Sequence, residues 1–252
     1  MAAPTYPDVR LLTLARDGEE WRPAGYVGRV NPFLPFLVVG WGELWLATLV
    51  PVWVAWAFVW AGIGTTWVSL AYLLGRPGML GKVALPTVAF WALLPFFLTA
   101  RGAARTGVRT MREWKVELVP GLWVGGWPRH GAPEYAQLDL TAELPRRGVA
   151  LRYRCLPMLD GAPADTAVWR AAVDQAVAWR AEGLPVLVHC AYGHGRSVAV
   201  CIGVLVAEGV SPTWESAHQL VLAVRPRAVM TPAQRAMVAA AVATLPGPRA
   251  RV

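Results

Sequence analysis

The sequence predicts an α/β domain, with a central sheet flanked by helices, that follows an N-terminal pair of transmembrane helices. Residues 116–245 alternate short β-branched runs with helical patterns, an order typical of a parallel or mixed sheet covered by helices on both faces. Residues 44–75 carry no Asp, Glu, Lys or Arg, and residues 83–100 form a second apolar run. A loop with two glycines joins the apolar run at residues 186–188 to a helical pattern.

The composition of the 252-residue chain separates it from an ordinary soluble domain. Apolar residues make up 56% of it, 14 residues are tryptophan, and only 16% are charged. The formal net charge is +8, and the basic residues are almost all arginine, as is typical of GC-rich bacterial genomes. No apolar run opens the chain, so a cleavable secretory signal is not expected.

The two apolar runs are long enough to cross a bilayer, which takes roughly 20 helical residues. We expect the first span at residues 44–66, in a helix that begins near Trp41 and continues past Pro51 with a kink. The second, shorter span is expected at residues 83–100. Apolar side chains surround both helices instead of lining one face, which argues against a buried soluble hairpin. A third span, made by splitting the first run near Gly62, stays open.

Basic residues after the second span set the expected orientation. Residues 101–115 carry the strong positive bias of a cytoplasmic segment, from Arg101, Arg105, Arg109, Arg112 and Lys115. We therefore expect a multi-pass protein of the cytoplasmic membrane whose termini and α/β domain are cytoplasmic. The arginines either anchor the span or form a basic stripe on anionic headgroups. We expect a polar tail at residues 1–31, a transmembrane region at residues 32–100 and a basic segment at residues 101–115. The α/β domain is expected at residues 116–245, followed by a tail at residues 246–252.

Start and stop signals place the helices of the α/β domain. An amphipathic pattern covers residues 166–182. A second helix is expected to start at Ser211 and to end at Arg225, and Thr231 with Gln234 has the form of a capping box for the last one. Ligands of open α/β sheets bind at the carboxyl ends of the strands, which directs attention to the loop after the most apolar strand.

That loop carries the reactive residues. Cys190 and Arg196 are separated by five residues, and Ser197 follows. A thiol before a helix N-terminus and near cations ionises readily, and the thiolate is the nucleophile. The planar fork of Arg196 can hold two phosphate oxygens at once. Cysteine and arginine also meet at this spacing by chance, but the strand before and the helix after favour a phosphate-binding cysteine loop.

The backbone of the loop is suited to a phosphate dianion. Gly193 and Gly195 are free to adopt positive φ, so the N–H groups can point inward. The Ser197 hydroxyl is placed to hydrogen-bond the Cys190 sulfur, and His189 is expected to brace the loop. No Gly-Lys-Ser/Thr follows, which argues against a Walker-type nucleotide loop. The residues expected to contact phosphate are Ala191, Tyr192, Gly193, His194, Gly195 and Arg196.

A general acid is needed to protonate the leaving oxygen, and Asp160 is the candidate. It lies in LPMLDGAP, a Pro/Gly-rich turn after the strand-like run LRYRCL. The alternative for Asp160 is a purely structural turn residue that caps Gly161. Asp165 is the other candidate acid, but it precedes a helical pattern and is better explained as an N-cap.

Residues 117–243 resemble the catalytic domain of the dual-specificity phosphatase family, within the protein tyrosine phosphatase superfamily. The segment VPGLWVGGWP resembles the family's first strand pair, and YAQLDLTAE resembles its buried second parallel strand. The segments LPMLDG, HCAYGHGRS and RPRAVMTPAQ follow in the family's order. The resemblance covers about half of the chain, and the cysteine loop is its specific part.

The resemblance implies hydrolysis through a cysteinyl-phosphate intermediate, without a metal or other cofactor. The loop departs from several phosphoinositide-directed relatives, which carry lysines at the positions of Ala191, Tyr192 and His194. This departure argues against highly charged inositide substrates. The implied roles are nucleophile for Cys190, phosphate clamp for Arg196, acid and then base for Asp160, and sulfur partner for Ser197.

The substrate stays open at this level. One hypothesis is a lipid phosphate, since the chain resembles the phosphatidylglycerophosphate phosphatases that share this domain type. The other is a phosphoprotein beside the membrane. A catalytically silent phosphate-binding module of the same fold is the alternative to an enzyme. Expected partners are a phosphorylated lipid or protein and the membrane, not nucleic acid, and the oligomeric state is undetermined.

The three cysteines suit a reduced protein. Cys155 and Cys201 are most simply buried packing residues. A reversible protective disulfide between Cys190 and one of them is the alternative.

Overall fold

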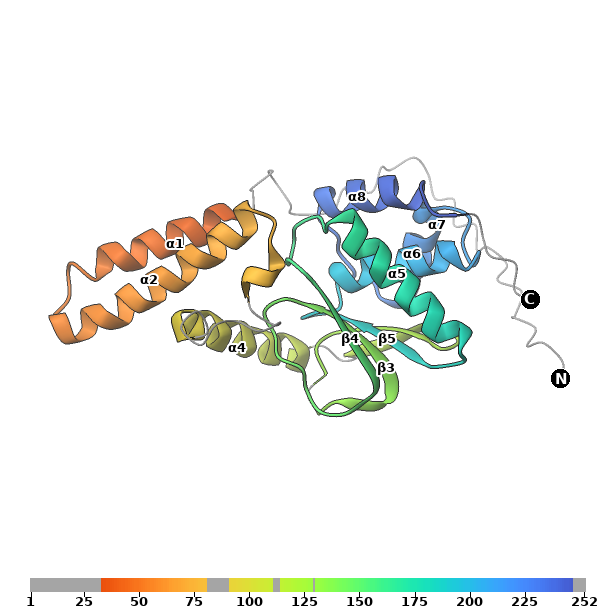
Figure 1. Cartoon of the computed structure of the whole chain (residues 1–252), viewed down its shortest axis with the longest axis horizontal. Helices are drawn as coiled ribbons and strands as arrows, with labels where there is room; N and C mark the ends of the chain where they lie inside the picture. The colour runs from red at the N-terminus through yellow and green to blue at the C-terminus, as the bar shows by residue number, and fades with distance from the viewer. Residues whose placement is uncertain (1–32, 81–90, 111–113, 129, 247–252) are drawn as a thin grey trace. The chain divides into compact units, whose positions relative to one another are not determined.

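A chain reversal divides the long apolar run of the N-terminal half into two helices. In the computed structural model, which describes residues 33–80, 91–110, 114–128 and 130–246, these helices are α1 (Phe33–Leu46) and α2 (Val52–Leu73). They pack side by side as a hairpin (Figure 1). The expected polar tail at residues 1–31, the start of the second span and residues 247–252 lie outside the described residues.

The expectation that one helix continues past Pro51 is wrong. Helix α1 ends at Leu46, where the Thr48 hydroxyl donates to the Trp45 carbonyl at 2.7 Å. Pro51 then precedes α2 as its N-cap, with φ −55° and ψ 145°. Proline has no N–H to donate inside a helix but is accepted at a helix start, so the chain restarts there instead of kinking.

Gly62 is a contact position within α2, and α2 is not split there. A Cβ on Gly62 would lie 2.7 Å from Leu44 Cγ, and one on Gly40 would lie 2.7 Å from Thr65 Oγ1. The two glycines therefore allow α1 and α2 to approach closely.

Helix α2 is the one described helix that is long and apolar enough to cross a membrane. Its 22 residues extend about 33 Å, whereas the 14 residues of α1 extend only about 21 Å. Only 28% of its apolar 18-residue stretch is buried, and the Trp53 side chain is 78% exposed. A short 3₁₀ helix, η1 (Pro77–Leu80), follows. Helix α4 (Leu94–Thr110) joins the end of the expected second span to the expected basic segment, including Arg101 and Arg105.

The second half forms the expected mixed α/β sheet. Its strands are β1 (Lys115–Val119), β2 (Leu122–Gly125), β3 (Ala132–Thr141), β4 (Ala150–Met158) and β5 (Val186–His189), in the order β1-β2-β5-β3-β4. Strand β1 is antiparallel to β2, and all other pairs are parallel. The apolar run that precedes the cysteine loop thus becomes the central strand, with all four residues buried.

Helices pack against one face of this sheet. They are α5 (Thr166–Ala181), α6 (Arg196–Ala207), α7 (Trp214–Val224) and α8 (Pro232–Val242), which share one hydrophobic core with the strands. The opposite face, in the described part of the chain, carries an aromatic cluster of Trp114, Trp123 and Tyr135 around Leu187, with the Lys115 ammonium over its rings. This differs from the expectation of helices on both faces.

Capping residues explain the helix boundaries. The Asp165 side chain accepts from Ala167 N at 2.7 Å, and Thr231 with Gln234 forms the expected capping box. Helix α7 begins at Trp214 instead of Ser211, because Thr213 forms its own capping box with Ser216.

The crossing of α5 and α6 requires Gly203. A Cβ there would lie 2.5 Å from Trp169 Cζ2 and 2.5 Å from Val173 Cγ2, both on α5. We expect Gly203→Ala to lower the free energy of unfolding by about 1–3 kcal/mol, because the buried Trp169 must move. The control is Gly102→Ala in α4, where the added Cβ meets nothing within 4 Å and should stabilise by roughly 0.5–1 kcal/mol. Thermal unfolding of both variants measures the difference, and a Gly203→Ala protein as stable as the wild type would contradict this packing.

Candidate active site

The cysteine loop connects the carboxyl end of β5 to the N-terminus of α6. Cys190 directly follows β5 and is 2% exposed, and Arg196 is the first residue of α6 and is 1% exposed. A nucleophilic side chain and a permanent cation are therefore buried at the two ends of one short loop. This is the sheet edge at which α/β folds bind their ligands.

The carbonyls of residues 191–194 are each bonded to groups outside the loop. Because C=O and N–H point in opposite directions across a trans peptide, the following N–H groups are directed to the loop interior. Gly193 N–H accordingly donates to Cys190 Sγ at 3.2 Å. Trp127 N–H donates to the Ala191 carbonyl at 3.0 Å, and Val229 N–H donates to the His194 carbonyl at 3.0 Å. The Arg225 guanidinium donates to the Tyr192 carbonyl at 3.0 Å and to the Gly193 carbonyl at 2.8 Å.

Of the two loop glycines, Gly193 alone has positive φ. Its φ is +74°, and a Cβ would lie 2.5 Å from the Gly125 carbonyl carbon, so both its conformation and its surroundings require glycine. The expectation of positive φ at Gly195 is wrong. Gly195 is the N-cap of α6 with φ −111°, and a Cβ there would lie 3.2 Å from Gln234 Oε1.

The neighbours of Cys190 include the two polar residues expected from the sequence. Ser197 Oγ lies 3.4 Å from Cys190 Sγ and is buried. His189 is buried below the loop, with Nε2 3.9 Å from Asp139 Oδ2 on the adjacent strand β3. Asp139 also accepts from the Tyr153 hydroxyl at 2.8 Å and from Thr141 Oγ1 at 2.7 Å. His189 thus lies beside a buried polar network that centres on Asp139, and its role in bracing the loop stays a prediction.

Arg196 is held by an acidic residue that the sequence analysis did not single out. Its Nη2 and Nη1 lie 2.7 Å and 2.9 Å from the two Glu143 carboxylate oxygens, and Nη1 also donates to the Met158 carbonyl at 3.0 Å. A guanidinium has five N–H donors, and these contacts use three of them. The second fork, made of Nε–H and the other Nη2–H, is not used by these contacts.

Asp160 lies beside that second fork. Its Oδ1 is 3.2 Å from Arg196 Nε, and its side chain is 50% exposed. An acid at this position can reach both solvent and an oxygen of a phosphate bound to Arg196. Asp165, the other candidate, instead caps α5.

The site has a fixed pattern of charge. Burial alone would lower the pKa of Arg196, but the carboxylates of Glu143 and Asp160 outweigh it and raise that pKa well above its ordinary value.

Burial raises the pKa of the Cys201 thiol in α6, so this cysteine stays neutral. Cys155, Cys190 and Cys201 are all free thiols in this structure. Among the described residues, no group of three or more His, Cys, Asp or Glu could hold a metal ion.

Glu143 and Arg225 are the main residues that the sequence analysis missed. Glu143 ends the segment YAQLDLTAE, two residues after β3, and an acid at the carboxyl end of a buried parallel strand is a usable signal. Arg225 was considered only as the end of a helix. Nothing local in the sequence indicates that its guanidinium turns back to the Tyr192 and Gly193 carbonyls.

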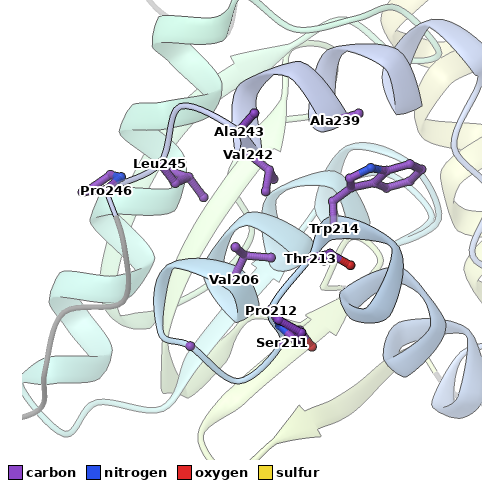
Figure 2. A pocket seen from close by; sticks show the side chains of 11 residues that line it. Val206, Ser211, Pro212, Thr213, Trp214, Ala239, Val242, Ala243, Leu245 and Pro246 are labelled. Carbon is purple, nitrogen blue, oxygen red and sulfur yellow. The ribbon is translucent and has the colours of Figure 1, made fainter.

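A separate apolar pocket of about 520 Å³ lies at the other end of α6 (Figure 2). It is lined by Val206 near the end of α6, Trp214 on α7, and Val242 and Leu245 at and after the end of α8. Val206 follows Arg196 by ten residues of helix, which places the pocket roughly 15 Å from Arg196, so it is not part of the cysteine loop site.

Comparisons with known proteins give structural neighbours only. No family model and no curated protein matches the sequence. Similar solved structures include PTPMT1 in complex with PI(5)P, with 14% identity, a TM-score of 0.46 and coverage of 53% of this chain and 97% of that chain. A second is a mouse putative dual specificity phosphatase complexed with zinc tungstate, with 23% identity, a TM-score of 0.46 and coverage of 54% of this chain and 91% of that chain. A third is human DUSP28, with 22% identity, a TM-score of 0.46 and coverage of 54% of this chain and 97% of that chain. The chemistry inferred for this chain therefore rests on the residues of its own loop.

His194 provides a pH test of the loop structure. Burial, with Arg225 and Arg227 nearby, lowers the pKa of His194 to about 4, whereas an unfolded histidine titrates near ~6.5. The unfolded state therefore binds more protons between these values, and this contribution to stability is lost as the pH falls from 6.5 to 4. We expect the wild type to lose thermal stability relative to His194→Gln over this range, with exposed His130→Gln as the control. A stability difference that does not change with pH would contradict a half-buried, neutral His194.

Proposed function

We propose that the chain is a membrane-anchored, cysteine-dependent phosphomonoesterase that acts through a cysteinyl-phosphate intermediate. The observation that carries the proposal is the burial of Cys190 and Arg196 at the two ends of a loop whose carbonyls at residues 191–194 bond to groups outside it. Inward N–H groups and a guanidinium fork bind a phosphate dianion, and the sulfur at the base of the loop is its nucleophile.

In the first step, Cys190 Sγ attacks phosphorus while the bond from phosphorus to the substrate oxygen breaks. The Arg196 Nε–H and Nη2–H groups hold two of the non-bridging oxygens, whose charge grows in the transition state. Asp160, beside Arg196 Nε, donates its proton to the leaving oxygen, so the product is a neutral alcohol.

In the second step, water attacks the phosphorus of the cysteinyl phosphate and the S–P bond breaks. Asp160, now a carboxylate, accepts the proton of that water. The Ser197 hydroxyl, 3.4 Å from Cys190 Sγ, donates a hydrogen bond to the departing thiolate. Inorganic phosphate leaves, and the starting protonation state is restored.

The exposed surface of the helical hairpin supports membrane anchoring. A buried helix of a soluble protein would also be apolar, but α2 is mostly unburied and its exposed side chains include Trp53 and Trp56. Such a surface is costly in water and stable in lipid. Arg76, which follows α2, and Arg101 on α4 fit the positive side of the membrane.

A lipid phosphate is the substrate that this arrangement favours. Leu159 and Ala142, which precede Asp160 and Glu143, share a buried hydrophobic cluster with Val68 and Ala71 in the last turns of α2. The site therefore lies close to the end of the proposed span, where a headgroup phosphate could reach Cys190 with its acyl chains still in the bilayer. A phosphoprotein held beside the membrane is the second candidate, since the half-exposed Asp160 leaves the site open to solvent.

Loss of the sulfur nucleophile tests the covalent mechanism. We expect Cys190→Ser to lower kcat by about 10³-fold or more, because a serine hydroxyl at this position has no general base to activate it. The matched control is Cys155→Ser, which should retain wild-type turnover. Phosphate release is measured on the full chain in detergent micelles, and a Cys190→Ser protein with substantial activity would refute the mechanism.

The role of Asp160 is tested by leaving-group dependence. We expect Asp160→Asn to slow hydrolysis of phenyl phosphate by about 10²-fold or more, while 4-nitrophenyl phosphate, whose leaving group needs no proton, is largely spared. Asp165→Asn is the control and should affect helix stability only. Equal losses on both substrates would assign the acid role to another residue.

The substrate class is tested by direct competition. Phosphate release from phosphatidylglycerophosphate in vesicles is compared with release from phosphotyrosine and phosphoserine peptides at equal concentration. We expect a higher kcat/KM for the lipid. A preference for a peptide would instead support the phosphoprotein hypothesis, and activity on neither would favour the silent phosphate-binding module.

A further inference from the structure

Asp139 is a buried acidic residue that the proposed mechanism does not use. It lies near the end of β3, which has β5 on one side and β4 on the other (Figure 1). Its side chain is 1% exposed. A buried carboxylate is stable only where hydrogen-bond donors replace the lost water, so its donors indicate which parts of the chain it holds together.

One oxygen of this carboxylate closes the turn that follows β3. Asp139 Oδ1 accepts from the backbone N–H of Thr141 at 2.9 Å and from the Thr141 hydroxyl at 2.7 Å. The same hydroxyl lies 3.3 Å from the Leu144 carbonyl. An aspartate that bonds the backbone two residues ahead fixes a local turn. Asp139, with Thr141, therefore restrains both ends of the segment at residues 141–144.

The other oxygen is fixed by the sheet. Asp139 Oδ2 accepts from the Tyr153 hydroxyl on β4 at 2.8 Å, and His189 Nε2 on β5 lies 3.9 Å from it. Burial and the Asp139 carboxylate raise the pKa of Tyr153, so its hydroxyl stays a donor. The carboxylate thus links the turn to both strands that flank β3.

The turn carries Glu143, the residue that pairs with Arg196. The two Glu143 oxygens lie 2.7 Å and 2.9 Å from Arg196 Nη2 and Nη1, and Oε2 also accepts from the Ala142 N–H at 2.9 Å. A bidentate pair requires the carboxylate to face the planar guanidinium squarely. The backbone at Glu143 therefore determines how Arg196 is turned and which of its N–H groups are left for a ligand.

We propose that Asp139 is a positioning residue that fixes the turn at residues 141–144 and, through Glu143, sets the orientation of the Arg196 guanidinium. This inference rests on the proposed role of Arg196 as the phosphate clamp. Its consequence is that Asp139 affects how the phosphoryl oxygens are held and does not affect protonation of the leaving group.

The kinetic test compares Asp139→Ala with Asp139→Asn in the full chain in detergent micelles. Asparagine keeps an oxygen at the Oδ1 position for Thr141, whereas alanine removes both acceptors. We expect Asp139→Ala to lower kcat/KM about 10-fold or more for phenyl phosphate and 4-nitrophenyl phosphate alike, because Arg196 holds the oxygens of both. Asp139→Asn should stay within about threefold of the wild type. A loss confined to phenyl phosphate, or equal losses in the two variants, would overturn the inference.

A milder pair of variants separates positioning from general destabilisation, and it carries the test if Asp139→Ala does not fold. Thr141→Val and Thr213→Val both replace a hydroxyl with a methyl group, but Thr213 caps α7 and lines the apolar pocket at the other end of α6. We expect Thr141→Val to lower kcat/KM about 3- to 10-fold, the effect of one hydrogen bond. Thr213→Val should lower thermal stability only. Equal losses of activity in both variants would refute the positioning role.

A double-mutant cycle tests the path through Glu143. If Thr141 and Asp139 act by holding Glu143, adding Thr141→Val to Glu143→Gln should cause less than about twofold further loss. An undiminished loss would place the effect on another route, such as His189 next to Cys190, and would contradict the inference.

Hydrogen exchange tests the turn independently of enzyme activity. We expect backbone amides of residues 141–144 to exchange faster in Asp139→Ala and Thr141→Val than in the wild type or Thr213→Val, because the turn loses contacts to Asp139 Oδ1. Unchanged exchange in this segment would refute the role of Asp139. If the wild-type chain hydrolysed no phosphate ester, the proposed function would fail, and this measurement would still decide whether Asp139 fixes the turn.

Discussion

The buried ion pair between Arg196 and Glu143 is the interaction on which the arrangement of the site depends. A guanidinium that is 1% exposed has lost nearly all of its hydration, and its charge is tolerable only if carboxylates and carbonyls replace water. Glu143 supplies both of its oxygens, Met158 supplies a carbonyl, and Asp160 adds a second negative charge. These contacts bring together the segments after β3 and β4 and the start of α6, which are far apart in the sequence.

The same ion pair determines which part of Arg196 can bind a ligand. Glu143 occupies the end of the guanidinium, and so the Nε–H side is presented to the loop and to Asp160. The outward bonds of the loop carbonyls, two of them to Arg225, present the N–H groups in the same space. In the proposed mechanism, phosphate binding and nucleophile placement depend on two buried arginines with different tasks. Arg196 would contact the phosphate, and Arg225 holds the backbone of the loop.

Much of this could be predicted from the sequence, because the relevant signals are local. The strand, loop and helix around Cys190, the capping box at Thr231 and the N-cap at Asp165 each depend on residues within a few positions of one another. The sequence did not indicate that Glu143 pairs with Arg196, since the partners are 53 residues apart. Periodicity likewise could not locate the chain reversal before Pro51, because both sides of it are equally apolar.

Turnover through a bond between phosphorus and the Cys190 sulfur is the central claim, and trapping that bond tests it most directly. The full chain would be mixed with a radiolabelled phosphate ester, quenched within milliseconds and digested, and the labelled peptide identified by mass spectrometry. The account predicts phosphate on the sulfur of Cys190 in the peptide that contains residues 189–196. Phosphate release at a normal rate with no label on that peptide, or with label on another residue, would contradict it.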